Sequence, residues 1–279
     1  MARRWLVTGC SSGLGRALAA AAAEAGDTVA ATARKPADLA ELHRCHGGRI
    51  LPLALDVRDA EQCRSAVADA VDRLGGLDVL VNNAGNGVFG TVEEVGDEEL
   101  RDQLETLVAG PWRLARLALP VMRAQGGGHI LNVSSLAGRM SFPGLAAYVT
   151  GKHALEGMTQ ALAAEAAPFG VRVTALEPAG YATRYGTSLT DAADRSPLYR
   201  DATDPMREQL RGMAQLPTVG RPEEFARDVL RIVAADGPLP VRIPVGPGSL
   251  DHVAAAVRAA AEELAAVRAL VDESASAAG

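Results

Sequence analysis

Three side chains that could together move a proton lie close to one another in the sequence: Ser135, Tyr148 and Lys152. Tyr148 and Lys152 are four residues apart, which places both on the same face of a helix. A free phenol has a pKa of about 10, too high for a base near neutral pH, and a nearby ammonium group lowers it. The three residues therefore predict acid–base chemistry at Tyr148. The alternative is that Tyr148 is an ordinary residue of an amphipathic helix.

Ser135 is expected at the end of a strand, and Tyr148 within a helix. Residues 128–135 form an apolar stretch typical of a buried strand, and residues 145–167 have helical periodicity. Parallel sheets bind ligands beyond the carboxyl ends of their strands. The predicted strand therefore brings Ser135 to an edge where a ligand can bind.

Similar strands and helices alternate along most of the chain, which predicts βαβ units. Right-handed crossovers then give a Rossmann-type, doubly wound parallel sheet with helices on both faces, in a single domain over 1–279. The predicted strands cover residues 4–9, 28–33, 49–55, 77–85, 128–135 and 171–178, with an edge strand at 240–246. The predicted helices cover residues 13–25, 36–45, 60–74, 98–125, 145–167 and 221–237.

Two segments fall outside this alternation. Residues 184–219 are polar and interrupted by Pro197, Pro205 and Pro217, which predicts a substrate lid over the sheet edge. Residues 249–271 predict a C-terminal helix, and the last residues, 273–279, are expected to fray. This helix carries one apolar stripe, interpreted as a docking surface, at Val253, Val257, Ala260, Leu264, Val267 and Val271.

A glycine-rich turn, Thr8–Gly15, separates the first strand from the first helix. Glycines there permit a tight turn and bring a pyrophosphate close to the helix N-terminus, although a plain βα turn is the alternative. The second strand ends in Ala33 and Arg34, without the acidic residue that reads ribose hydroxyls. A guanidinium group pairs well with phosphate oxygens, so Arg34 predicts NADP(H). A solvated surface arginine is the alternative.

The composition excludes several other classes of protein. The net charge is −6 with no basic stripe, which argues against nucleic-acid binding. Three scattered cysteines indicate a reduced cytoplasmic protein. The HRCH sequence at 43–46 lacks a second ligand pair, so no metal site is expected. No apolar run has the length of a membrane span.

Taken together, these motifs resemble the short-chain dehydrogenase/reductase family, classical type, and look nearest to its hydroxysteroid and retinol dehydrogenase-like carbonyl reductases. The resemblance covers roughly residues 3–270. It rests on TGCSSGLG at 8–15, Asp56, NNAG at 82–85, Ser135, YVTGK at 148–152 and the segment 178–183.

The resemblance implies a role for each matching position. Tyr148 would be the general acid or base, Lys152 would bind the nicotinamide ribose and lower the pKa of Tyr148, and Ser135 would bind the substrate oxygen. Thr183 would touch the carboxamide, and Arg34 with Ser11 would bind the adenosine phosphate. The implied cofactor-binding residues are Gly9, Ser11, Ser12, Gly13, Leu14, Gly15, Arg34, Asp56, Val57, Asn83, Ala84, Gly85, Tyr148, Lys152, Pro178 and Thr183.

The sequence departs from the family pattern at three positions. Leu107 stands where the family has an asparagine that holds a water of the proton relay, Gly151 where serine is common, and Ala179 where the family has glycine. If a proton relay survives, its substitute would be a water held by backbone carbonyls near Leu107, or direct exchange with bulk solvent through the mouth of the lid. The alternative is that Leu107 packs in the core.

The expected activity is NADP(H)-dependent interconversion of a carbonyl and an alcohol on a hydrophobic small molecule. Because Leu107 departs from the family pattern, a non-redox enzyme on the same scaffold, such as a dehydratase, epimerase or cyclase, is the second possibility. A protein that senses the cofactor without turnover is the third. Expected pocket residues are Val88, Phe89, Met140, Phe142, Tyr181 and Tyr185. A homodimer or homotetramer is predicted through small residues of the Tyr148 helix, Gly151, Ala154, Gly157 and Ala161.

Overall fold

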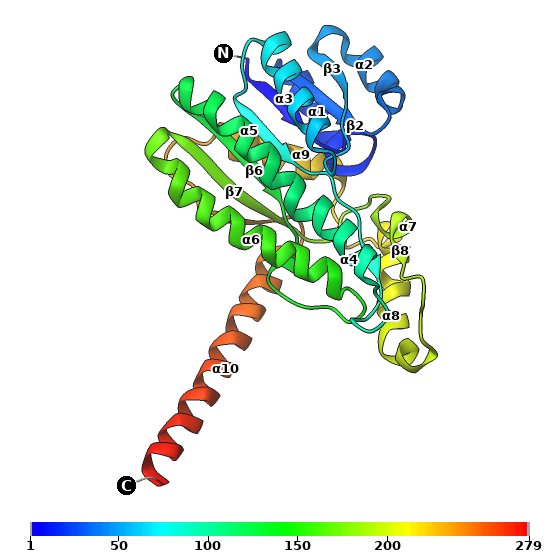
Figure 1. Ribbon diagram of the computed structural model, residues 1–279, viewed down its shortest axis with the longest axis vertical. Helices are drawn as coiled ribbons and strands as arrows, with labels where there is room; N and C mark the ends of the chain where they lie inside the picture. Colours follow the sequence, from blue (N-terminus) through cyan, green and yellow to red (C-terminus); the bar gives the residue numbers. More distant parts are fainter. Residues whose placement is uncertain (1, 278–279) are drawn as a thin grey trace.

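The core of the protein is one sheet of seven strands, seen in Figure 1, a computed structural model that describes residues 2–277. The strands are β1 (Arg4–Val7), β2 (Thr28–Ala33), β3 (Ile50–Ala54), β4 (Val79–Asn82), β6 (Gly128–Val133), β7 (Val171–Pro178) and β9 (Arg242–Val245). Every neighbouring pair is parallel, in the order β3-β2-β1-β4-β6-β7-β9. The order reverses between β1 and β4, and doubly wound sheets bind their ligands at that point.

Helices cover both faces of the sheet (Figure 1). One face packs against α1 (Gly13–Glu24), α2 (Ala40–His46) and α9 (Pro222–Ala234), and the other against α3 (Ala60–Leu74), α5 (Gly110–Ala124) and α6 (Ala146–Ala166). Because strand side chains alternate, Trp5 and Val7 join the first core while Leu6 joins the second. Both faces are therefore apolar, which is why the central strands have continuous apolar sequences.

The predicted α/β architecture is confirmed. Most strand and helix boundaries agree with the sequence to within two or three residues, and β9 is the predicted edge strand beside β7. The predicted helix over 98–125 is interrupted. It consists of α4 (Asp97–Leu104), a π-helical turn (Glu105–Ala109) and α5.

The proposed lid over 184–219 contains regular structure that the sequence did not predict. It includes α7 (Tyr185–Ser188), β8 (Thr190–Asp191) and α8 (Arg200–Gly212), and β8 pairs with β5 (Val88–Phe89) in a second, two-stranded sheet. Pro205 lies inside α8, where proline normally disfavours a helix. Because the segment is interrupted by prolines, the sequence analysis did not predict these helices and this strand.

The C-terminal helix is α10 (Ser249–Ala277). Residues 273–277 were expected to fray but are helical in this structure. Residues 278–279 lie outside the described residues. It projects away from the body of the protein (Figure 1). Over the described residues, no helix is both long and apolar enough to cross a membrane.

Candidate active site

The glycine-rich turn has the shape expected of a phosphate cradle. Gly9 and Gly13 have φ values of 73° and 60°, in the left-handed region that favours glycine. A Cβ on Gly15 would lie 2.6 Å from the carbonyl oxygen of Gly9, so this position needs glycine for close packing. The first turn of α1 carries no acidic residue, and Ser12, at its N-cap, makes no capping hydrogen bond with its side chain. The N–H groups at this helix end thus remain free for an anion.

Asn83 holds this turn against the end of β4. Its Nδ2 donates to the carbonyl of Thr8 at 2.8 Å, while the Thr8 hydroxyl accepts from the backbone N–H groups of Asn83 and Ala84, both at 2.9 Å. The structure therefore places the Asn83 amide on the glycine turn, where it holds β4 and the turn together. The neighbouring Asn82 donates to Asn132 at 2.8 Å, in a buried contact between β4 and β6.

Asp56, which follows β3, lies in a cluster with two arginines. The Arg58 guanidinium donates to the Asp56 carboxylate at 2.8 Å and holds its pKa below the usual range, and the charge of Arg34 adds to this effect. Arg34 is exposed, just beyond the buried end of β2. Val57 is buried against Gly110 of α5. The sequence analysis did not predict the contact of Arg58 with Asp56, although the two residues are only two positions apart in the sequence.

The remaining predicted cofactor residues lie around the same edge. Pro178 ends β7, and the Thr183 side chain approaches Gly13, where its Cγ2 would lie 3.4 Å from an added Cβ. Leu14 packs against the core beneath the turn, Ser11 is partly exposed, and Gly85 follows β4. The thiol of Cys10, also in the turn, is fully buried, and burial raises its pKa to about 12.

Ser135, Tyr148 and Lys152 come together as predicted. Ser135 follows β6, and its hydroxyl accepts from the backbone N–H of Ala137 at 3.1 Å. Tyr148 and Lys152 lie in the first two turns of α6, with the Lys152 ammonium 5.5 Å from the centroid of the Tyr148 ring. The Ser135 hydroxyl is close enough to the phenol to act on its pKa as a hydrogen-bond partner.

The expectation that Lys152 lowers the pKa of Tyr148 stays a prediction, because other groups dominate that pKa here. Burial of the phenol dominates and raises its pKa, while hydrogen bonding with Ser135 and Tyr185 lowers it. Tyr185 stacks at a tilt on Tyr148, with ring centroids 5.6 Å apart. The Tyr185 hydroxyl is buried without a hydrogen-bond partner of normal geometry, although the two phenols are close enough to affect each other's pKa. A protonated Tyr148 suits a general acid.

Lys152 is turned toward the sheet and is only 5% exposed. Its ammonium donates to the carbonyl of Val133 at 2.7 Å. Burial lowers the pKa of Lys152 to about 8, and the charge of Glu156, one turn further along α6, partly opposes this. Glu156 is itself buried and pairs with Arg242 at 3.0 Å.

Leu107 lies in the π-helical turn and packs directly behind this site. Its side chain is 1% exposed, and it fills the space beside two glycines. A Cβ on Gly151 would lie 2.9 Å from Leu107 Cδ1, and one on Gly85 would lie 3.1 Å from Cδ2. Gly151 is thus buried within the chain and is not part of an outer face, which corrects its predicted role in an oligomer contact. Ala154, Gly157 and Ala161 remain exposed.

The residues expected to line a substrate pocket divide into two groups. Phe89, Leu145 and Leu189 form a small apolar cluster, against which Phe142, Tyr148, Val149, Tyr185, Met206 and Leu210 pack. This cluster joins the lid to the catalytic helix. Tyr181 lies elsewhere, buried edge-on against Phe225 in the main core, and Val88 is buried in β5. Met140 is partly exposed in the loop before α6.

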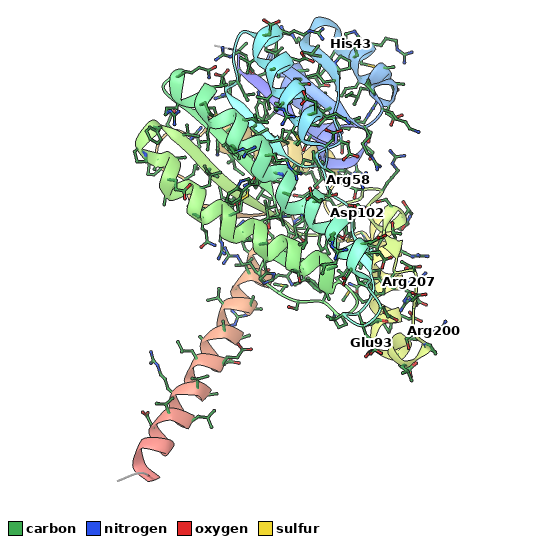
Figure 2. All side chains as sticks on the ribbon, in the orientation of Figure 1. His43, Arg58, Glu93, Asp102, Arg200 and Arg207 are labelled. Carbon is green, nitrogen blue, oxygen red and sulfur yellow. The ribbon has the colours of Figure 1, made fainter. Side chains whose placement is uncertain are left out.

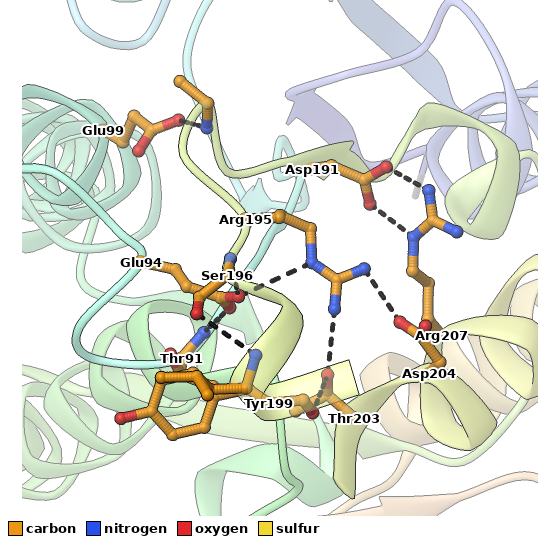
Figure 3. A network of polar contacts seen from close by, with 12 residues as sticks. Thr91, Glu94, Glu99, Asp191, Arg195, Ser196, Tyr199, Thr203, Asp204 and Arg207 are labelled. Carbon is orange, nitrogen blue, oxygen red and sulfur yellow. Dashed lines mark hydrogen bonds and ion pairs between the residues drawn. The ribbon is translucent and has the colours of Figure 1, made fainter. Parts of the chain in front are cut away.

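Charged groups fasten the lid to the body (Figure 3). Glu94 is buried, and its carboxylate accepts from the backbone N–H groups of Thr91 and Ser196, both at 2.8 Å. Within the lid, Arg195 pairs with Asp204 at 2.9 Å, and Asp191 binds both Arg207 and Arg211. Figure 2 shows Arg207 on the side of the molecule where α8 lies. The sequence analysis missed this network, in which the contact between Glu94 and Ser196 joins residues 102 positions apart.

A cavity of about 730 Å³ lies at the opposite end of the sheet, lined by the first residues of β1, β4, β6 and β7. Since Tyr148 lies beyond the carboxyl ends of the strands, this cavity is not part of the candidate active site. Within residues 2–277, no group of three His, Cys, Asp or Glu side chains is arranged to hold a metal ion.

Comparison with known proteins gives one consistent result. The family model for short chain dehydrogenases matches residues 3–194. The chain is 38% identical over 266 residues to oxidoreductase BOA17 of Botryotinia fuckeliana, an alignment that covers 94% of this chain and 96% of that protein. A relative described as an alcohol dehydrogenase from Thermococcus sibiricus, complexed with 5-hydroxy-NADP, is 26% identical with a TM-score of 0.72, covering 88% and 97% of the two chains.

The similarity also extends over the projecting helix. A crystal structure of a short-chain dehydrogenase from Streptomyces avermitilis is 37% identical, with a TM-score of 0.88, and the alignment covers 98% of each chain. The glycine turn, the grouping of Ser135, Tyr148 and Lys152, the strand order and these relatives agree with one another. The protein belongs to the short-chain dehydrogenase/reductase family, a family of nicotinamide-dependent oxidoreductases.

Proposed function

We propose that the protein is an NADP(H)-dependent oxidoreductase that interconverts a carbonyl and an alcohol on a hydrophobic small molecule. The observation that carries this proposal is the meeting of Ser135, Tyr148 and Lys152 beside the glycine turn, at the carboxyl ends of β1 and β6. One edge of the sheet thus offers an anion cradle and a proton donor together.

The residues present fit a dinucleotide. The glycine turn is a cradle that side chains would fill, and the start of α1 offers uncapped N–H groups to a pyrophosphate. Solved relatives are described with either NADP-type or NAD-type cofactors, so the choice between them rests on this chain's own residues. Arg34 is exposed and has no acidic residue at position 33, which supports a 2′-phosphate.

In reduction, the bound cofactor would supply the hydride that adds to the carbonyl carbon. Tyr148 gives its proton to the carbonyl oxygen, since its raised pKa keeps the phenol protonated at neutral pH. Ser135 donates a hydrogen bond to the same oxygen and orients it. Lys152 holds its position through the Val133 carbonyl and places a positive charge behind the phenol. In oxidation the proton returns from the alcohol to Tyr148.

The apolar cluster beside Tyr148 supports a hydrophobic substrate. Phe89, Phe142 and Leu189 join the lid to α6, and the unpartnered hydroxyl of Tyr185 is a polar group among them. Small-molecule sites are lined mainly by apolar side chains and orient their ligands by a few polar groups. Tyr185 would therefore bind a polar group of the substrate near the reacting carbon.

The proposal is tested by mixing the protein with NADPH and a panel of ketones and aldehydes while the cofactor absorbance is followed. The parent should consume NADPH, and Tyr148→Phe should lose about 10²–10⁴-fold in turnover with nearly unchanged NADPH affinity. Equal turnover by Tyr148→Phe contradicts the mechanism. Tight NADPH binding without turnover by the parent would favour a non-redox enzyme or a cofactor sensor.

As part of the same proposal, the protein is a cytoplasmic homo-oligomer, dimer or tetramer. The outer face of α6 is smooth and exposed at Ala154, Gly157 and Ala161, so a second copy can pack closely on it. All three cysteines are free, as in a reducing compartment. A monomeric mass by light scattering at micromolar concentration contradicts the oligomer.

A further inference from the structure

The last helix has an apolar face that, within residues 2–277, no other part of the protein covers over most of its length. α10 has 29 residues, which corresponds to a length of about 43 Å. It contacts the body only near its start, where Ser249 is buried and Val253 is half-buried (Figure 1). Large apolar side chains are exposed along the helix, among them Leu250, Val257, Leu264, Val267 and Val271.

These apolar residues follow a heptad repeat. With Leu250 at the first position, called a, the a residues are Leu250, Val257, Leu264 and Val271, and the fourth positions, called d, are Val253, Ala260 and Val267. No charged residue occupies an a or d position over 250–271. An uninterrupted a/d repeat over three heptads is the pattern of a helix that winds around another helix.

The charges beside the apolar seam indicate what the partner helix is. The positions that flank the seam, e and g, hold alanine except at Glu263 (g), Arg268 (e) and Leu270 (g). In two parallel helices in register, a g residue meets the e residue five places further along the partner. Glu263 of one copy would then meet Arg268 of the other, and the two-fold symmetry makes the same pair twice. An antiparallel pair sets g beside g and e beside e, so it cannot join these two residues.

We propose that α10 forms a parallel, in-register, two-stranded coiled coil with α10 of a second copy of this chain. The seam consists of the a and d residues, and Glu263 pairs with Arg268 of the partner on both sides. The two bodies then lie at the same end of the coiled coil, where both helices begin. This contact is separate from the α6 face, so it joins copies whether or not that face is also used.

A disulfide across the seam tests the arrangement directly. Leu264→Cys in a Cys45→Ser background removes the exposed native thiol and places one cysteine at an a position, since Cys10 and Cys63 are buried. Equivalent a residues face each other only in a parallel, in-register pair. Mild oxidation of the full chain should therefore link most of it as a dimer on a non-reducing gel. The matched control, Glu262→Cys, lies on the outer side of the helix and should not be linked.

Two further variants check the seam and its charges. Val257→Glu with Leu264→Glu should halve the molar mass of the assembly by light scattering, while Ala265→Glu, one position outside the seam, should leave it unchanged. Arg268→Glu should raise the dissociation constant roughly tenfold by setting Glu263 against a like charge, and adding Glu263→Arg should restore it.

Each other outcome overturns the proposal. Equal linking of Leu264→Cys and Glu262→Cys, or of neither, excludes a parallel pair in register. A halved mass without the Leu264→Cys disulfide shows that α10 packs on the body of the partner or in the antiparallel sense. An unchanged mass after the double glutamate substitution, together with no disulfide in Leu264→Cys, shows that α10 joins no copies.

Discussion

The side chain of Leu107 occupies the space that a side chain at position 151 would need. A Cβ on Gly151 would lie 2.9 Å from Cδ1 and 3.2 Å from Cβ of Leu107. The two departures from the family pattern are therefore one compensated change, in which a larger residue on the π-helical turn is matched by the loss of a side chain on α6. Leu107 packs in the core, as the plainer of the two sequence interpretations held.

This pairing predicts strong coupling between the two positions. Leu107→Asn should cost about 3 kcal/mol, since it removes buried apolar surface and buries an amide. Gly151→Ser should cost about 1–3 kcal/mol, because the new side chain meets Leu107. The double variant should be more stable than the sum of the two by at least about 1 kcal/mol. Urea unfolding of all four proteins measures this, and additive losses would contradict the pairing.

The lowered pKa of Lys152 predicts a specific dependence of stability on pH. The pKa is about 8 in the folded protein against the usual lysine value of 10.5. Between these values the unfolded chain binds the proton and the folded chain does not, so this residue makes the unfolding free energy rise with pH. Below about pH 8 the burial of the charge costs up to about 3 kcal/mol. Lys152→Met should therefore be more stable than the parent at pH 7, although inactive.

The control for this experiment is the same pair of proteins at about pH 10.5. The titration of every other group largely cancels when the unfolding free energies of parent and variant are subtracted. The excess stability of Lys152→Met should therefore shrink as the pH rises from 8. A difference that stays constant over this range shows that the pKa of Lys152 is not lowered.

Arg34 is expected to decide the choice of cofactor. Arg34→Ala should weaken NADPH binding by about 10- to 100-fold, because it removes a charged hydrogen-bond donor for the 2′-phosphate, and should leave NADH binding unchanged. Lys35→Ala removes the adjacent exposed charge and serves as the matched control. Ala33→Asp is a poorer test, because Ala33 is only 4% exposed at the end of β2. Equal losses for both cofactors in Arg34→Ala would sink the NADP(H) assignment.

Tyr185 should separate stability from activity. Its hydroxyl is buried beside the Tyr148 phenol without a hydrogen bond of normal geometry, so Tyr185→Phe should leave the unfolding free energy unchanged or raise it by up to about 1 kcal/mol. If the hydroxyl binds substrate, the same change should lower kcat/KM by about tenfold. Tyr199→Phe, which removes a hydroxyl bonded to Glu93 at the surface, is the control and should leave turnover alone. A Tyr185→Phe protein that is less stable and fully active contradicts both parts.

Glu94 should set how firmly the lid is held. Glu94→Gln removes the charge that accepts from the N–H groups of Thr91 and Ser196, so the melting temperature should fall and KM should rise. Glu93→Gln is the neighbouring control, since Glu93 is exposed and accepts only from Tyr199 at the surface. Calorimetry and steady-state kinetics on both variants check this, and an equal response from the two would show that burial of the carboxylate is irrelevant.

The sequence predicted the parts of the site that depend on regular elements. Strand ends and helix spacing bring Ser135, Tyr148 and Lys152 together, because hydrophobic periodicity fixes both. The sequence did not predict the environment of these groups, because the pKa of Tyr148 depends on burial by segments that are distant in the chain. The lid helix α8 was missed because packing against Phe89 and Tyr148 outweighs the effect of Pro205. Contacts such as Glu94 with Ser196 join residues too far apart for spacing to predict.

The strand order also determines when the sheet can form. β1 lies between β2 and β4, and every neighbouring pair is parallel, so each pairing closes a loop that contains a whole crossover. The edge strand β9 joins β7 only after nearly all of the chain has been synthesised. Until then β7 has an unpaired apolar edge, on which a nascent chain can aggregate. A chain truncated before β9 should therefore aggregate after release from the ribosome. The full chain should refold slowly but completely when it is diluted out of urea.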